Sequence, residues 1–73
     1  MTLADAKEGF DCVVSLVHGE DITVQALRFG IDEGTVIRVQ KNIRGGPVIV
    51  SKNQLEIAIG RDIARAIEVV PTT

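Results

Sequence analysis

Apolar and polar residues alternate with a period of two over most of this chain, which is the spacing typical of half-buried β-strands. The first such segment covers residues 10–18, and its expected core-facing set is Phe10, Cys12, Val14, Leu16 and His18. Four more segments follow, bounded by glycine, proline and asparagine, at residues 35–41, 47–51, 55–59 and 67–70. Ile37 and Val39 are expected inward on the second, and Leu55, Ile57 and Ile59 on the fourth.

Between the first two predicted strands the period changes to that of a helix. Residues 22–29 place Ile22, Ala26 and Phe29 on one stripe, and Asp21 is the expected N-cap. Gly30 is the expected stop, because glycine adopts the left-handed conformation that ends helices. A single helical turn is predicted at residues 63–65, before the last strand.

Five short strands cannot form a stable flat sheet in a chain of 73 residues. Such a sheet must curl to bury its apolar face, so we expect one domain over residues 1–73. Its fold class is mostly β: a small SH3-like or OB-like five-stranded barrel. Composition agrees, because 10 Val and 9 Ile make up 19 of the 33 apolar residues, and β-branched side chains favour strands. One cysteine and one histidine exclude an internal disulfide and a Cys/His zinc site.

The net charge of −2 argues against nucleic acid as a partner. Residues 1–34 carry seven acids and two bases, and residues 35–73 carry six bases and three acids, so the halves differ in sign. No apolar run reaches the roughly 20 residues of a membrane span, and the first residues lack a signal-peptide pattern. We therefore expect a cytoplasmic protein without direct membrane insertion, and we leave a homo-oligomer open.

Few residues offer chemistry. Cys12 and His18 lie six positions apart on one strand, about 20 Å, which is too far to share a metal. His18, Glu20 and Asp21 occur in one turn and are the candidate ligands for a weakly held divalent cation such as Fe²⁺; the alternative is a solvated, capped turn. No nucleophile elbow or phosphate loop occurs, so we predict no enzymatic activity and no resident cofactor.

Recognition by stacking is not expected. Phe10 and Phe29 are the only aromatic residues, and both fall on core-facing positions, which disfavours polyproline peptides and single-stranded bases. A basic edge follows the second predicted strand and its loop, with a plain solvated face as the alternative. With one arginine of the predicted helix, the candidate partner-binding residues are Arg28, Arg38, Lys41 and Arg44.

The order of motifs resembles FeoA-type proteins. A helix ending in Leu27-Arg28-Phe29-Gly30 with Gly34 beyond it, the segment 45–50 (GGPVIV), residues 57–59 (IAI) and the ending Ala64, Ile67, Val69 are similar to that family over nearly the whole chain. The pattern departs where the family often has arginine, at Gln25-Ala26 and at Gly60.

This resemblance implies an SH3-like barrel that also occurs at the C-terminus of metal-dependent repressors. It implies a small accessory protein of ferrous iron uptake, docking on the cytosolic, GTPase-containing part of a FeoB-type membrane transporter. The location would then be cytoplasmic and peripheral to the inner membrane. The alternative is a transition-metal sensor or a regulatory module that acts with another partner.

Overall fold

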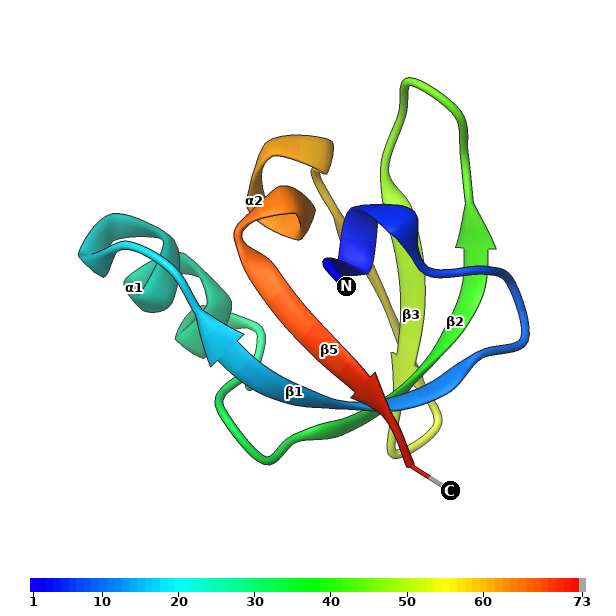
Figure 1. Ribbon diagram of the computed structural model, residues 1–73, viewed down its shortest axis with the longest axis horizontal. Coiled ribbons are helices and arrows are strands. Elements are labelled where there is room, and N and C mark those ends of the chain that lie inside the picture. The colour runs from blue at the N-terminus through cyan, green and yellow to red at the C-terminus, as the bar shows by residue number, and fades with distance from the viewer. Residues whose placement is uncertain (73) are drawn as a thin grey trace.

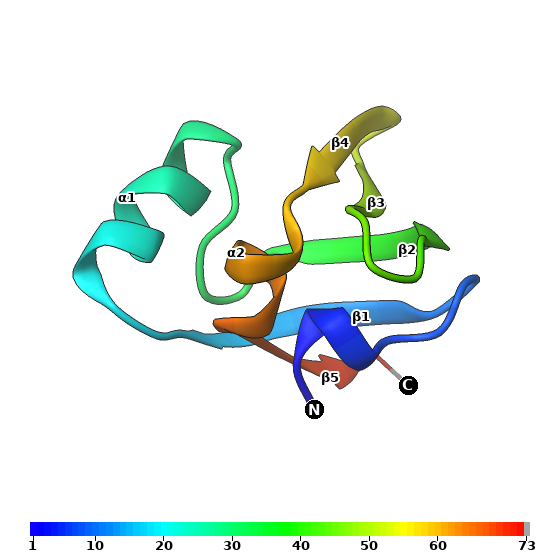
Figure 2. The same cartoon turned by 90° about the horizontal axis from the view of Figure 1, so that it is seen from above.

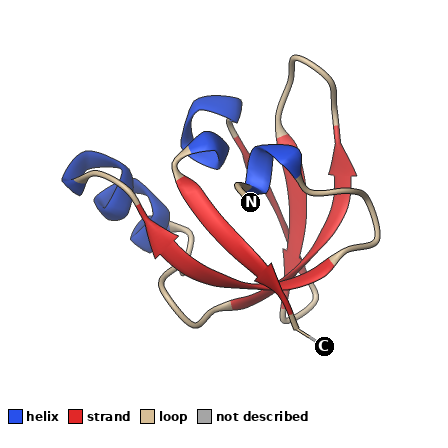
Figure 3. Ribbon diagram, viewed as in Figure 1, coloured by secondary structure: helices blue, strands red, loops and turns tan. Residues whose placement is uncertain are grey.

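The computed structural model describes residues 1–72 and consists of one five-stranded antiparallel sheet with two short α-helices and a 3-10 turn (Figures 1 and 3). In chain order the elements are η1 (Leu3–Asp5), β1 (Asp11–Val17), α1 (Glu20–Arg28), β2 (Val36–Asn42), β3 (Val48–Lys52), β4 (Leu55–Ile59), α2 (Arg61–Arg65) and β5 (Ile67–Pro71). The predicted mostly-β fold is confirmed, with a helix after the first strand and a helical turn before the last. Residue 73, the end of the predicted domain, lies outside the described residues.

The strand order is β4-β3-β2-β1-β5, and the sheet curls strongly so that β1 and β5 face β3 and β4 (Figure 2). No ladder joins β4 to β5 among residues 1–72, so the barrel stays open along this seam. No helix in the described part of the chain is long and apolar enough to cross a membrane.

The core lies inside this curled sheet and consists of aliphatic side chains. Ile37 and Val39 are buried as predicted. Val50 of β3 lies opposite Val39, and Val48 of the same strand is buried as well. Leu3 of η1 and Ala64 of α2 are fully buried as well, so the two short helical elements close the open end of the sheet. Branching at Cβ limits the rotamer entropy that the valine and isoleucine side chains lose on burial. This is an advantage for a small core that has no disulfide or zinc site to stabilise it.

The expected core face of the first strand is wrong at its C-terminal end. Cys12 and Val14 are buried, but a β-bulge between Val14 and Leu16 interrupts the ladder with β5. A bulge adds one residue and shifts the alternation, so Leu16 turns outward, with 41% exposed, and Val17 packs against the core instead. His18, predicted on the core face, is exposed.

A second bulge, between Val39 and Lys41, has the same effect on β2. Strict alternation from Ile37 and Val39 would point Lys41 inward. With the bulge, Lys41 lies opposite Ile49 on the outer face, and Asn42 lies opposite the buried Val48. The bulge thereby keeps a charge in solvent and brings an amide to the edge of the core.

The helix α1 begins two residues earlier than predicted and has a different N-cap. Gly19 takes the N-cap position, and Asp21 lies within the first turn, where its charge still faces the positive end of the helix. Ala26 is buried as expected, but Phe29, predicted on the core stripe, is 41% exposed. A helix of nine residues contacts the core along so short a stretch that only a small residue sits at the centre of the contact.

The predicted end of α1 is confirmed. Gly30 has φ of 75°, its N–H donates to Leu27 O, and the Ile31 N–H donates to Ala26 O, which is the Schellman arrangement. Ile31 is buried, so the end of the helix is held by an apolar contact as well as by the two hydrogen bonds.

Candidate functional site

The turn that holds the candidate metal ligands pairs its histidine with another strand. His18 Nε2 contacts the Glu68 carboxylate of β5, and the backbone N–H of His18 donates to Ala66 O. Glu20 and Asp21 form the first turn of α1 and are exposed. Among residues 1–72, no three His, Cys, Asp or Glu side chains converge as a metal-binding group. The structure thus joins His18 to Glu68 rather than to a set with Glu20 and Asp21.

The four candidate partner-binding residues occupy two separate places. Arg28 ends α1, whereas Arg38 and Lys41 lie on β2 and Arg44 lies in the β2–β3 loop. Both views place α1 and the β2–β3 loop on opposite sides of the molecule (Figures 1 and 2). Lys41 and Arg44 therefore form a basic hairpin surface, and Arg28 does not belong to it.

Arg38 differs from its neighbours because its charge already has a partner. Its Nε and Nη2 donate to the two carboxylate oxygens of Asp11 at 2.8 and 3.0 Å, across the β1–β2 ladder. The hydrogen bond from Arg38 holds the pKa of Asp11 below its ordinary value. This contact joins the acidic first half of the chain to the basic second half, in line with the charge asymmetry. Arg38 is thus less available than Lys41 and Arg44, neither of which forms an ion pair among residues 1–72.

A polar network around Arg61 was not predicted. Its guanidinium donates to Gly46 O at 2.9 Å, to Ala4 O at 3.0 Å, and to both Asn42 Oδ1 and Ile43 O at 2.6 Å. The amide nitrogen of Asn42 donates in turn to Ala4 O and Ala6 O at 2.9 and 2.8 Å. One arginine thus joins α2, the β2–β3 loop and the N-terminal segment.

No periodic signal marks either residue of this network. FeoA-type proteins often have arginine at the position of Gly60, and the arginine that forms this network is the next residue of this chain. Gly60 itself is the N-cap of α2. Because the Arg61 guanidinium donates to four acceptors of its own chain, it joins these segments of the fold.

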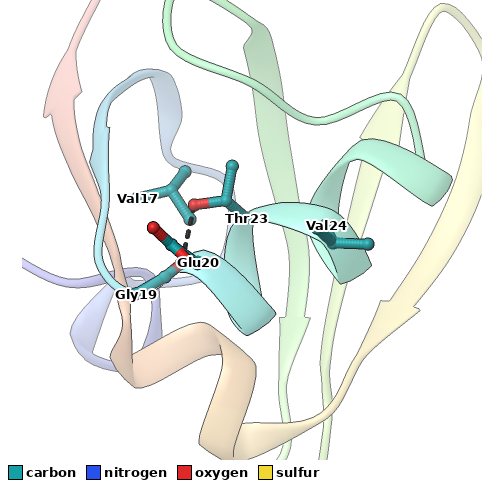
Figure 4. Close-up of a pocket in the computed structure, with 5 residues that line it drawn as sticks. All are labelled: Val17, Gly19, Glu20, Thr23 and Val24. Atoms are coloured by element: carbon teal, nitrogen blue, oxygen red, sulfur yellow. Dashed lines mark hydrogen bonds between the residues drawn. The ribbon is translucent and has the colours of Figure 1, made fainter.

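An open surface groove of about 550 Å³ lies where β1 passes into α1 (Figure 4). It is lined by Val17, Gly19, Glu20, Thr23 and Val24. The Thr23 hydroxyl donates to Gly19 O at 2.7 Å and is thus already hydrogen-bonded within the helix end. Glu20 supplies the one carboxylate in this mainly apolar lining. Groups for acid–base or nucleophilic catalysis do not converge in this lining.

Cys12, the single thiol, is fully buried in the core. Burial raises its pKa to about 11, so at neutral pH it remains a protonated, inert thiol. It acts as a small apolar side chain, as the pattern of β1 predicted.

These features define a small SH3-like β domain with a basic hairpin surface and an apolar groove. The model of the FeoA domain family matches residues 1–71. "Putative Fe(2+) transport protein A" of Methanocaldococcus jannaschii is 40% identical over 68 residues, which cover 92% of this chain and 82% of that protein. The chain therefore belongs to the FeoA domain family, the accessory proteins of ferrous iron transport.

Solved structures show the same fold. A crystal structure of an iron uptake regulatory protein (FeoA) has a TM-score of 0.84 at 24% identity and covers 96% of this chain and 93% of its own. A manganese-dependent transcriptional repressor reaches a TM-score of 0.89 at 20% identity, with 97% of this chain covered and 41% of its own. ScaR with bound Zn²⁺ has a TM-score of 0.86 at 27% identity, again with 97% covered but only 36% of its own length. The fold thus occurs nearly alone in the FeoA structure and as part of longer chains, one of which is a transcriptional repressor.

Proposed function

We propose that this chain docks on the cytosolic, GTPase-containing part of a FeoB-type ferrous iron transporter and modulates its activity. The observation that carries the proposal is the FeoA family match over residues 1–71, which covers nearly the whole chain. The 40% identical relative named as a putative Fe²⁺ transport protein supports it. The protein would then act in the cytoplasm, held at the inner membrane by its partner.

The docking surface that we propose is the basic hairpin surface of Lys41 and Arg44. Both side chains are exposed and form no ion pair within residues 1–72, so their charges are available to an acidic surface. Exposed complementary charges raise the rate of association and fix the orientation of the complex. Arg28 is a separate candidate at the end of α1, and Arg38 contributes less because Asp11 already neutralises it.

Docking is tested by titrating the isotope-labelled chain with the cytosolic domain of its cognate transporter and following amide shifts. The double variant Lys41→Ala/Arg44→Ala is expected to weaken binding about tenfold at low salt, with a smaller effect at high salt. The matched control, Lys7→Ala/Arg65→Ala, removes the same two residue types from exposed positions elsewhere. Equal loss in both variants would reject the hairpin as the surface, and unperturbed amides at high micromolar partner would reject docking.

A second candidate function is a transition-metal sensor. It is favoured by the structural similarity to ScaR with bound Zn²⁺ and to a manganese-dependent repressor. The ligands would come from His18, Glu20 and Asp21, and Glu68 would have to release the imidazole first. An anaerobic Fe²⁺ titration tests this function: line broadening centred on His18 supports it, and unchanged spectra at millimolar Fe²⁺ reject it.

A further inference from the structure

The two edges of the open sheet differ in how they are protected. The edge of β5 is covered by the N-terminal segment, because the Val69 N–H donates to Met1 O and Thr2 bridges to Glu68. The edge of β4 has no such cover within residues 1–72. Its five residues include no proline or lysine, and Leu55 is 69% exposed. An unprotected edge of this kind is a template for another strand.

The β3–β4 turn determines which backbone groups of β4 are available. Asn53 and Gln54 both have positive φ, and Lys52 lies opposite Leu55, which defines a two-residue hairpin of type I′. In such a hairpin the flanking pair exchanges both hydrogen bonds, and bonded pairs then alternate. The N–H and C=O groups of Glu56 and Ala58 therefore point away from β3, and among residues 1–72 nothing bonds to them.

The outward N–H and C=O groups of Glu56 and Ala58 can pair with the same groups of a second copy. With a two-fold axis at Ile57, each Glu56 lies opposite Ala58 of a second copy, and all five residues of β4 are paired. About four backbone hydrogen bonds form, and the only charge on the strand faces a methyl group. An axis at Glu56 would place two carboxylates opposite each other, which is destabilising, and an axis at Ala58 would leave Leu55 without a partner.

We propose that β4 is a homodimerisation edge, at which two copies of this chain join their sheets antiparallel across a two-fold axis at Ile57. The inference is independent of docking on a transporter. The Glu56 side chain is exposed and Ala58 beside it is exposed too, so the outer side of the edge is open to a second strand. A single strand pair buries less than the roughly 1,200 Å² of a stable interface, so the dimer is weak, with a dissociation constant of roughly 0.1–1 mM.

Sedimentation equilibrium of the full chain, from about 20 µM to about 2 mM, brackets that constant and measures the dimer directly. Opposite charges are the sharpest probe of the register. Ala58→Lys places two lysine–glutamate pairs across the interface, and Ala58→Glu places two glutamate pairs there. Two cross-strand pairs change the dissociation constant by about 2- to 30-fold, so Ala58→Lys strengthens the dimer and Ala58→Glu weakens it. With an axis at Ala58, the introduced lysines would face each other and weaken it instead.

Ala58→Pro removes an outward-facing donor that β3 does not use, and Ala58→Ser is the matched control that keeps this donor. The proline variant is expected to be monomeric at about 2 mM and the serine variant to dimerise as the wild type does. If the proline variant does not fold, the comparison of Ala58→Lys with Ala58→Glu still tests the dimer. A wild type that stays monomeric at 2 mM overturns the proposal and leaves the edge to a strand of another protein, and a dimer weakened by Ala58→Lys overturns the register.

Discussion

Replacing Arg61 with alanine tests whether its network holds the fold together. The substitution removes four charged hydrogen bonds, of 2.6 to 3.0 Å, that join α2, the β2–β3 loop and the N-terminal segment. Ala4 O keeps its bond from Asn42, but Gly46 O and Ile43 O lose this donor. The effect should therefore spread beyond α2 to segments far away in the sequence.

The magnitude follows from how much of the network solvent can replace. A hydrogen bond to a charged group contributes about 1.5–3 kcal/mol, but the four bonds share one group and water reaches part of it. We expect a loss of about 2–4 kcal/mol, out of the roughly 4–11 kcal/mol that a chain of this length has in total. The melting temperature should fall by roughly 10–30 °C.

Arg65→Ala is the matched control on the same helix. Arg65 contacts only the Asp62 side chain, at 3.3 Å, and both side chains are exposed, so its removal should cost at most about 0.5 kcal/mol. Urea unfolding followed by circular dichroism gives both values. A double-mutant cycle with Asn42→Ala should give a coupling of about 1–3 kcal/mol. If Arg61→Ala costs no more than Arg65→Ala, the network does not stabilise the fold and the reasoning is refuted.

Three further outcomes follow from single residues. Gly30→Ala should cost about 1–2 kcal/mol in urea unfolding, because its φ of 75° strains an L-residue. Gly30→Asn should cost less, because asparagine tolerates this conformation better, and equal costs would contradict this. Cys12, with its pKa raised to about 11, should react with a thiol reagent at pH 8 only after unfolding, and fast labelling of the native chain would show that it is accessible. The pKa of Asp11 is lowered in the fold, so its ion pair stabilises the protein at neutral pH. Asp11→Asn should therefore unfold at lower urea than the wild type at pH 7. This gap should begin to narrow as the pH falls below about 4 and should close only below the lowered pKa, and a gap that is as wide at pH 2 as at pH 7 would contradict this.

The pattern misled at the bulge of β1, at the short helix and at the start of β4, where Leu55 was expected inward and is 69% exposed. Period-two alternation assigns Leu16 to the core, and one extra residue in β1 reverses this assignment. In β2 a strict alternation would turn Lys41 inward, and the bulge keeps it on the exposed edge where it was expected. A bulge is decided by how two strands meet, and the residues before it carry no sign of it. Phe29 fails for a related reason, because a helical stripe gives the direction of a side chain but not whether another element covers it.

Some features of the candidate site could be found from the sequence, and others depend on the tertiary structure. The basic residues of the β2–β3 hairpin could be found from the sequence, because charge and exposure go together on an outer strand face. The neutralisation of Arg38 by Asp11 could not, since the two residues are 27 positions apart and meet only through the β1–β2 register. The same holds for the contact between His18 and Glu68, which takes the histidine away from the carboxylates beside it.

By itself the sequence determined the number of strands and their order along the chain, the helix with its glycine stop and the mostly-β class, while the family came from the resemblance of its motifs to FeoA-type proteins. These depend on local periodicity, on β-branched composition and on the conformational freedom of Gly30, all of which act over a few residues. Tertiary structure alone decided the open seam between β4 and β5, the side to which residues after each bulge point, and the hydrogen bonds by which Arg61 joins distant segments. Each of these depends on a contact between distant segments, whose geometry exists only after the sheet has curled.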